Sequence, residues 1–170
     1  MHRLDKETSG VLLAAKTAET HQKLVTLFSQ RQIEKTYLAI CVGSPGDLTV
    51  NAPIGRHPTK RKEMSINREK GKEAITRFKV LEIKENLTLV EAALITGRTH
   101  QIRVHLKHCN TPVLGDSIYG SSSANKKAGI TRQLLHAHRM RFIHPITQKP
   151  LELTAPLPAD MSSLFYKFVD

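Results

Sequence analysis

A pair of β-rich segments separated by a short polar turn constrains the fold of this chain more than any other feature. Residues 74–83 (AITRFKVLEI) and 88–95 (TLVEAALI) are rich in β-branched side chains, which favour an extended backbone. The polar Lys84-Glu-Asn86 follows the first segment and contains Asn86, a residue that is common in turns. This pattern predicts an antiparallel β-hairpin.

Other segments add strands and dispersed helices. Residues 10–16 (GVLLAAK) are expected to form a buried central strand. Thr17 suits the N-cap of an amphipathic helix over 18–30, and Asp160 suits the cap of a last helix over 161–169. Strands outnumber helices, which predicts an α+β fold with a mixed, largely antiparallel sheet and flanking helices. The remaining predictions are a basic loop or loose hairpin at 51–72, a helix at 99–108, loops at 112–120 and 121–130, and strands at 35–42, 134–143 and 151–154.

Length, cysteine usage and charge narrow the class of protein. The 170 residues suffice for one domain with a core. No apolar run is long enough to span a bilayer, and a charged N-terminus predicts no secretory signal. Cys41 and Cys109 lie outside any CxxC pair, which predicts reduced thiols in a cytoplasmic protein. The formal charge of +11 favours a polyanionic partner such as nucleic acid, although a soluble protein can also simply be basic.

Four short stretches concentrate reactive side chains: residues 2–5, 35–37, 97–103 and 134–138. Taken singly, each has a plain structural interpretation. Asp5 suits a surface carboxylate, Tyr37 a core aromatic with its hydroxyl pointing outward, and Arg103 a solvated helix face. His105 and His108 stand three residues apart and raise the possibility of a metal, but no HExxH or similar signature is present.

Together these stretches resemble one family. HRLDKETSGVLLAAK at 2–16 is similar, nearly letter for letter, to the catalytic motif HRLDxxTSGLLLxAK of the RluA/RsuA-type pseudouridine synthases. The resemblance favours the RluA/RluC/RluD branch, which acts on large-subunit ribosomal RNA, and it covers nearly the whole chain. The other matching blocks follow in order: EKTYLA at 34–39, GRTHQIRVHL at 97–106, PVLGDSIYG at 112–120 and LLHAHRM at 134–140.

The resemblance implies an RNA isomerase that uses no cofactor and no metal. The glycosidic bond of a uridine breaks, the uracil turns over, and a carbon–carbon bond forms at C5. The family's catalytic aspartate falls on Asp5, its tyrosine on Tyr37, and the basic partner of the aspartate on Arg103. Because a neighbouring guanidinium keeps a carboxylate ionised, we expect Arg103 to clamp Asp5 from the helix.

RNA is the expected partner, either ribosomal RNA or tRNA, with no membrane, and the intact enzyme is expected to be a monomer. Arg3 falls on the residue that fills the gap left by the flipped nucleotide, and Leu135 on an apolar position of the pocket. The motif residues expected to bind RNA besides these two are His2, Thr8, Arg98, His100 and Gln101. The basic residues expected to neutralise phosphates are Lys60, Arg61, Lys62, Arg139 and Arg141.

Family members carry more chain before the HRLD motif, including strands of the catalytic sheet and often an S4-like RNA-binding domain. Residues 1–170 are therefore expected to be the C-terminal part of a pseudouridine synthase catalytic domain, whose sheet is incomplete at its N-terminus. An RNA-binding remnant that has lost activity by truncation is the alternative. A metal-dependent hydrolase built on the histidines is a third hypothesis.

Overall fold

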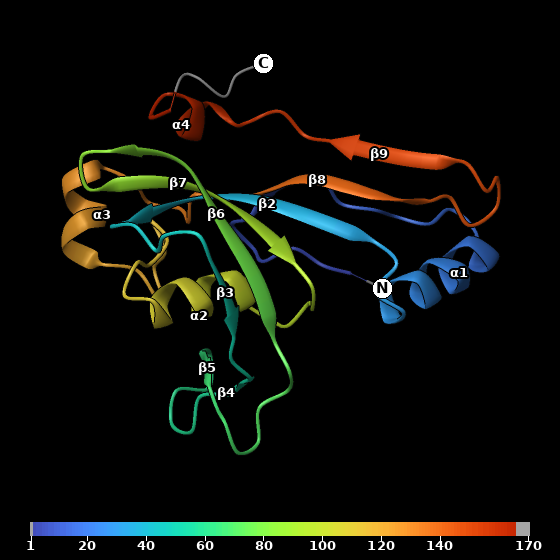
Figure 1. The fold of residues 1–170 in the computed structure, drawn as a ribbon, viewed down its shortest axis with the longest axis horizontal. Helices are drawn as coiled ribbons and strands as arrows, with labels where there is room; N and C mark the ends of the chain where they lie inside the picture. Colours follow the sequence, from blue (N-terminus) through green and yellow to red (C-terminus); the bar gives the residue numbers. More distant parts are fainter. Residues whose placement is uncertain (1, 166–170) are drawn as a thin grey trace.

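A seven-stranded sheet organises the fold (Figure 1). A computed structural model describes residues 2–165. The strands of the main sheet follow the order β1-β8-β2-β7-β6-β3, and β9 also pairs with β8. Their bounds are β1 Ser9–Gly10, β2 Glu34–Val42, β3 Leu48–Asn51, β6 Ile75–Lys84, β7 Leu87–Leu94, β8 Leu135–Ile143 and β9 Pro150–Thr154. Outside this sheet lie β4 Ile54–Arg56, β5 Met64–Ile66, α1 Ala18–Ser29, α2 Gln101–His108, α3 Ser122–Ala128 and α4 Ala159–Ser162.

The predicted hairpin is confirmed as β6–β7, and the rest of the sheet extends from it. β2 pairs antiparallel with β7 along one edge and with β8 along the other. Among the described strands, the short β1–β8 pairing is the parallel one. The fold is therefore α+β with a mixed, largely antiparallel sheet, as the sequence predicted. No helix within residues 2–165 is long and apolar enough to cross a bilayer.

The expectation that residues 10–16 form a central strand is wrong. Only Ser9 and Gly10 pair, and they do so at the margin of the sheet, beside β8. Gly10 has a φ of 115°, and a Cβ there would lie 2.2 Å from the carbonyl oxygen of Ala137, so the close approach requires glycine. Beyond it, the apolar residues pack against the α1 cluster instead of continuing the ladder. The residues that do so are Val11, Leu13 and Ala15.

Two further expectations need correction near the C-terminus. Residues 121–130 were expected to be a loop but contain α3, which Ser121 caps through the N–H of Ala124 and which ends at Gly129 with a φ of 67°. Asp160 does not cap the last helix, because α4 begins after Pro158. The Asp160 carboxylate instead pairs with Arg132. Part of the predicted helix, residues 166–169, lies outside the described residues.

The other predicted elements are confirmed. Thr17 caps α1 by accepting a hydrogen bond from the N–H of Thr20 (3.2 Å), and the basic segment 51–72 forms the β4–β5 hairpin. The predicted helix over 99–108 is α2, and it packs on one face of the sheet through Ile102 and Leu106. Alternate residues of β2 face the two layers. Ala39 and Cys41 pack toward α2, whereas Leu38 and Ile40 pack toward Leu114, Leu134 and Met161 of α4.

Candidate active site

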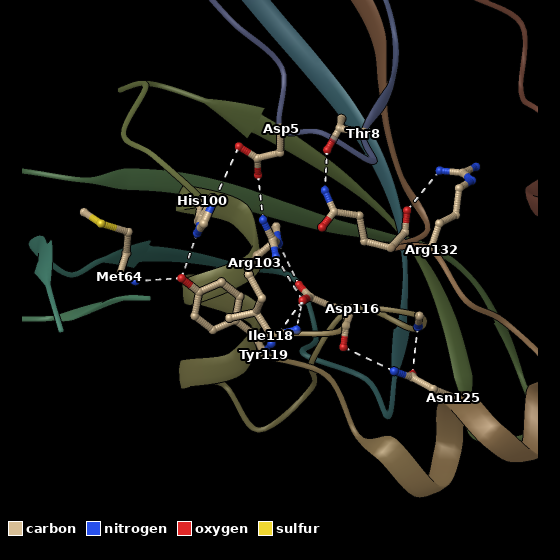
Figure 2. Close-up of polar contacts among 12 residues, drawn as sticks. Asp5, Thr8, Met64, His100, Arg103, Asp116, Ile118, Tyr119, Asn125 and Arg132 are labelled. Atoms are coloured by element: carbon tan, nitrogen blue, oxygen red, sulfur yellow. Dashed lines mark hydrogen bonds and ion pairs between the residues drawn. The ribbon is translucent and has the colours of Figure 1, made fainter. Parts of the chain in front are cut away.

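The predicted ion pair between Asp5 and Arg103 is present. The Nη1 atom of Arg103 donates to Oδ2 of Asp5 at 2.9 Å, across 98 residues of sequence (Figure 2). Asp5 lies in the segment that leads into β1, where its carbonyl accepts from the N–H of Thr8 (3.0 Å). Arg103 lies on α2 and is only 3% exposed. The Arg103 side chain is therefore held in a fixed position, and one edge of its guanidinium group faces the Asp5 carboxylate.

A second carboxylate, which the sequence analysis missed, completes this site. The Nε and Nη2 atoms of Arg103 donate to the two oxygens of Asp116, at 2.7 and 3.0 Å. Asp116 is fully buried. Asp116 could have been predicted from its position among the apolar residues of 112–120. A carboxylate buried among apolar residues requires a cation as a partner. Arg103 thus bridges two carboxylates, Asp116, which is fully buried, and Asp5, whose side chain is 17% exposed.

The charges of this cluster follow from its hydrogen bonds. Burial by itself would raise the pKa of Asp116, but the bonds from Arg103 and from the N–H of Tyr119 outweigh burial and hold that pKa below its ordinary value. Burial would likewise lower the pKa of Arg103, but its bonds to Asp116 and Asp5 raise it above the ordinary value. Both groups are therefore charged at neutral pH.

The loop that carries Asp116 is fixed by its own backbone and by α3. Oδ1 of Asp116 accepts from the N–H groups of Ile118 (2.9 Å) and Tyr119 (3.0 Å). Gly115 has a φ of 80°, and a Cβ there would lie 1.8 Å from the carbonyl oxygen of Arg132. Asn125 of α3 accepts from the N–H of Gly115 (2.8 Å) and donates to the Asp116 carbonyl (3.2 Å). The unexpected helix therefore supports the candidate site.

The segment that carries Asp5 is tied down on both sides. Before it, Nε2 of His2 accepts from the N–H of Leu13 (2.9 Å), and the imidazole stacks on Phe28 with centroids 4.8 Å apart. After it, Oγ1 of Thr8 accepts from Gln133 (2.7 Å). These bonds hold the reactive segment in a defined position relative to the sheet, although it lies close to the chain end.

Tyr37 faces the same cavity as Asp5, from β2. At this point β8 inserts His138 as an extra residue, so that Thr36 opposes Arg139 while Tyr37 opposes Ala137. Such a bulge changes the direction of nearby side chains. Burial raises the pKa of Tyr37 to about 12, and the negative charge of Asp5 adds to this shift. The phenol is therefore neutral at physiological pH.

Two adjoining cavities surround these residues. The larger has a volume of about 550 Å³, and Asp5 and Tyr37 line both. Most of the predicted site residues meet in the smaller cavity, which is lined by Arg3, Asp5, Thr8, Tyr37, Arg98, His100, Gln101 and Leu135. Lys35, which the sequence analysis quoted without a role, lines the larger cavity beside His2 and Arg31. Burial lowers the pKa of Lys35, and the charge of Arg31 lowers it further.

Gln101 differs from its expected role in RNA contact. Its Oε1 accepts from Oγ1 of Thr96 (2.7 Å) and the N–H of Arg98 (2.9 Å). Its Nε2 donates to the Ile75 carbonyl and Oγ1 of Thr76, both at 3.0 Å. All hydrogen-bonding positions of this amide are occupied by protein groups, so Gln101 fixes the loop that carries Arg98.

The other basic residues lie apart from the cavities. Lys60, Arg61 and Lys62 occupy the exposed loop between β4 and β5. Arg139 and Arg141 lie on β8, where Arg141 pairs with Glu152 at 2.7 Å. Their predicted contacts with phosphates therefore concern surfaces outside the Asp5 cavity.

His105 is buried and is held by contacts within the protein. Nδ1 of His105 contacts Oγ1 of Thr76 (2.9 Å), and Nε2 contacts the carbonyl of Ala52 (3.0 Å). Both ring nitrogens are therefore engaged by protein atoms. Among residues 2–165, no group of three or more His, Cys, Asp or Glu side chains is arranged to hold a metal ion.

Comparisons with known proteins identify the family of the chain. The family model described as RNA pseudouridylate synthase matches residues 1–108, which include Asp5, Tyr37 and Arg103. The chain therefore belongs to the RNA pseudouridylate synthase family.

Its relatives include the ribosomal large subunit pseudouridine synthase D of Xanthomonas campestris, 39% identical over 96% of this chain and 53% of the relative. An RNA pseudouridine synthase of Bacillus subtilis, YlyB, is 44% identical over 96% of this chain and 54% of the relative. The solved structure of human RNA pseudouridylate synthase domain containing 1 superposes with a TM-score of 0.80 at 32% identity, and the match covers 91% of this chain and 67% of that one. The chain thus spans about half the length of the curated relatives it matches.

Proposed function

We propose that residues 1–170 form the C-terminal part of the catalytic domain of an RNA pseudouridine synthase that isomerises a uridine in large-subunit ribosomal RNA. The observation that carries the proposal is the ion pair of Asp5 with the buried Arg103 (2.9 Å), beside a cavity that Asp5 and Tyr37 line. Relatives named for the large ribosomal subunit support this class of RNA. The proposal includes a cytoplasmic, monomeric enzyme that needs no metal and no cofactor.

The reaction exchanges one bond to the sugar for another. The N1–C1′ bond breaks, the uracil rotates, the C5–C1′ bond forms, the C5 proton leaves, and N1 takes up a proton. A carboxylate at Asp5 can serve as a nucleophile, on either the base or the sugar, or can stabilise a developing oxocarbenium ion. Arg103 fixes the direction of the Asp5 carboxylate, since a charge-assisted hydrogen bond is short and directional.

Tyr37 enters this reaction as a neutral phenol, because its pKa of about 12 lies well above physiological pH. A neutral ring suits packing against the flipped uracil, and its hydroxyl can relay a proton in a concerted step. Leu135 adds an apolar contact in the same cavity. Arg3 is exposed and lines both cavities, so it can enter the vacated stack and offset the few kcal/mol that base flipping costs.

Release of tritium from C5-labelled uridine tests the function directly. We expect the chain to release tritium from large-subunit rRNA transcripts in the presence of EDTA. Transcripts of small-subunit rRNA and tRNA form the comparison, and release from tRNA alone would reassign the substrate. RNA binding without release from any transcript would support the inactive remnant, whereas cleavage that EDTA abolishes would support a metal-dependent hydrolase.

The basic hairpin loop gives a separate prediction about affinity. The triple variant Lys60→Ala, Arg61→Ala, Lys62→Ala is expected to bind RNA more weakly and with a shallower salt dependence. Each lost phosphate contact lowers the slope of log K against log salt by about 0.7–0.9. Lys60 already pairs with Glu63 at 3.1 Å, so we expect the slope to fall by about 1.4–1.8, the amount for two contacts rather than three. Filter binding between low and high salt measures it.

The matched control removes the same charge elsewhere. Lys79→Ala, Lys126→Ala and Lys127→Ala together change exposed positions on β6 and α3. We expect this variant to retain the salt slope of the parent protein. Equal slopes for the parent protein and the hairpin variant would exclude this loop from the RNA interface.

A further inference from the structure

A chain of polar contacts joins the β4–β5 hairpin to Asp5. The N–H of Met64, on β5, donates to the hydroxyl of Tyr119 at 2.7 Å. The same hydroxyl lies 2.8 Å from Nδ1 of His100, whose Nε2 lies 3.9 Å from Oδ1 of Asp5 (Figure 2). The chain therefore ends on the carboxylate oxygen that Arg103 does not bind.

The direction of these bonds fixes the tautomer of His100. Burial lowers the pKa of His100, with the nearby charges of Asp5 and Arg103 acting in opposite senses, so the neutral ring with one proton is favoured. The Tyr119 hydroxyl accepts from Met64, and its own proton is then donated to Nδ1 of His100, since a buried hydroxyl proton without an acceptor is destabilising. The imidazole proton is then on Nε2 and faces Asp5.

Tyr119 also packs against the other parts of the site. It is 5% exposed and belongs to a cluster with Ile54 of the hairpin and Val104 of α2. The guanidinium carbon of Arg103 lies 5.0 Å from the centre of its ring. A movement of the β4–β5 hairpin would therefore be transmitted to both Arg103 and His100 through the side chain of Tyr119.

His100 is held in a conformation that needs such support. It precedes α2 with a φ of 58°, in the left-handed region, and makes no capping hydrogen bond through its side chain. A non-glycine residue adopts this region at a cost and keeps it only where surrounding contacts enforce it. The Tyr119 hydroxyl is the contact that fixes its imidazole.

We propose that Tyr119 and His100 are positioning residues that couple the seating of the β4–β5 hairpin on RNA to the geometry of Asp5. When the hairpin loop contacts RNA phosphates, β5 moves toward Tyr119. The distance from Nε2 of His100 to Oδ1 of Asp5 then shortens from 3.9 Å to that of a hydrogen bond. The carboxylate then has a donor on each oxygen when RNA is bound. This inference rests on the proposed function, and it assigns a role to two residues beyond the Asp5–Arg103 pair.

Tyr119→Phe is the test variant, because it keeps the ring over Arg103 and removes only the hydroxyl. We expect kcat to fall about tenfold, the effect of one hydrogen bond, while KM for RNA changes less than twofold. Thr88→Val is the matched control, since it removes a buried hydroxyl on β7 that lacks a hydrogen-bond partner. We expect the control to retain kcat.

Imidazole nitrogen chemical shifts provide a readout that does not depend on catalysis. In the parent protein we expect the Nε2–H tautomer of His100, and in Tyr119→Phe a mixture of tautomers with faster exchange of the Met64 amide. Addition of an rRNA stem-loop is expected to shift the His100 signals in the parent protein and to leave them unchanged in Tyr119→Phe. The coupling would be overturned if RNA left the His100 signals of the parent protein unchanged, or if the RNA-free parent protein and Tyr119→Phe gave the same His100 signals.

A double-mutant cycle distinguishes coupling from simple loss of structure. The hairpin triple variant should lower kcat in the parent protein and leave kcat unchanged in the Tyr119→Phe background, with KM raised in both. Additive losses of kcat would contradict the proposal. If no RNA is isomerised by the parent protein, the proposed function fails, and the nitrogen shifts still decide whether the hairpin and His100 are coupled.

Discussion

Asp5→Asn is expected to reduce tritium release by about 10³-fold or more, the range seen when an essential catalytic group is removed. The amide keeps the shape of the side chain but has neither the nucleophilicity nor the charge that the reaction requires. Arg103 remains bonded to Asp116 at 2.7 and 3.0 Å, so its charge stays compensated. We therefore expect the fold and the affinity for RNA to be retained.

Single-turnover release with saturating protein separates chemistry from binding in this experiment. Asp47→Asn is the control, because Asp47 accepts from the N–H of Val80 (2.7 Å) and its side chain does not line the Asp5 cavities. The control should keep full activity. An Asp5→Asn protein that retains more than about a tenth of the parent rate would exclude an essential role for this carboxylate.

Arg103→Met is expected to destabilise the protein by about 3–5 kcal/mol and to abolish activity. Removal of one partner from a buried ion pair leaves an uncompensated charge, and here the charge left behind is the fully buried carboxylate of Asp116. The double variant Arg103→Met, Asp116→Asn removes that charge as well. We expect the double variant to regain most of the lost stability in urea unfolding and to remain inactive.

The pH dependence of unfolding gives a second measure of this cluster. In the parent protein the pKa of Asp116 lies below its ordinary value of 3.8, so its contribution to stability is present above pH 3.8 and is lost as the pH falls through the lower, folded-state pKa. Without Arg103, burial raises the pKa of Asp116, and protonation relieves the destabilisation as the pH falls. The stability difference between parent and Arg103→Met should therefore be largest near neutral pH. A difference that is constant with pH would show that charge is not its cause.

Local patterns predicted the elements whose partners are close in sequence. The β6–β7 hairpin, the Thr17 cap and α2 were all expected from spacing and turn chemistry, and all are present. The segment 11–15 is a continuous apolar run, typical of a buried strand, yet three of its apolar side chains pack against α1 and its backbone has little pairing beyond Gly10. A strand needs a partner edge, and the sequence pattern alone does not indicate whether one is available.

The sequence predicted the site residues that belong to recognisable motifs. It did not predict those whose roles depend on contacts with residues far away in the sequence. The contact of Arg103 with Asp5 followed from the family resemblance. Asp116 and Tyr119 lie in a loop without periodicity, and their roles arise from contacts with Arg103, Met64 and His100. The bulge at His138 interrupts the alternation of side chains along β8. It depends on the pairing register between β8 and β2, which the sequence of β8 alone does not give.

The pairing of β1 with β8 has a consequence for how the protein is made. Ser9 contacts His136 at 2.9 Å across 127 residues of sequence, and the segment that carries Asp5 is held by this contact and by Gln133. During translation Ser9 leaves the ribosome 127 residues before His136 of its anchoring strand β8. Contacts of such long sequence separation form late. We therefore expect the segment that carries Asp5 to reach its final position only after β8 has left the ribosome.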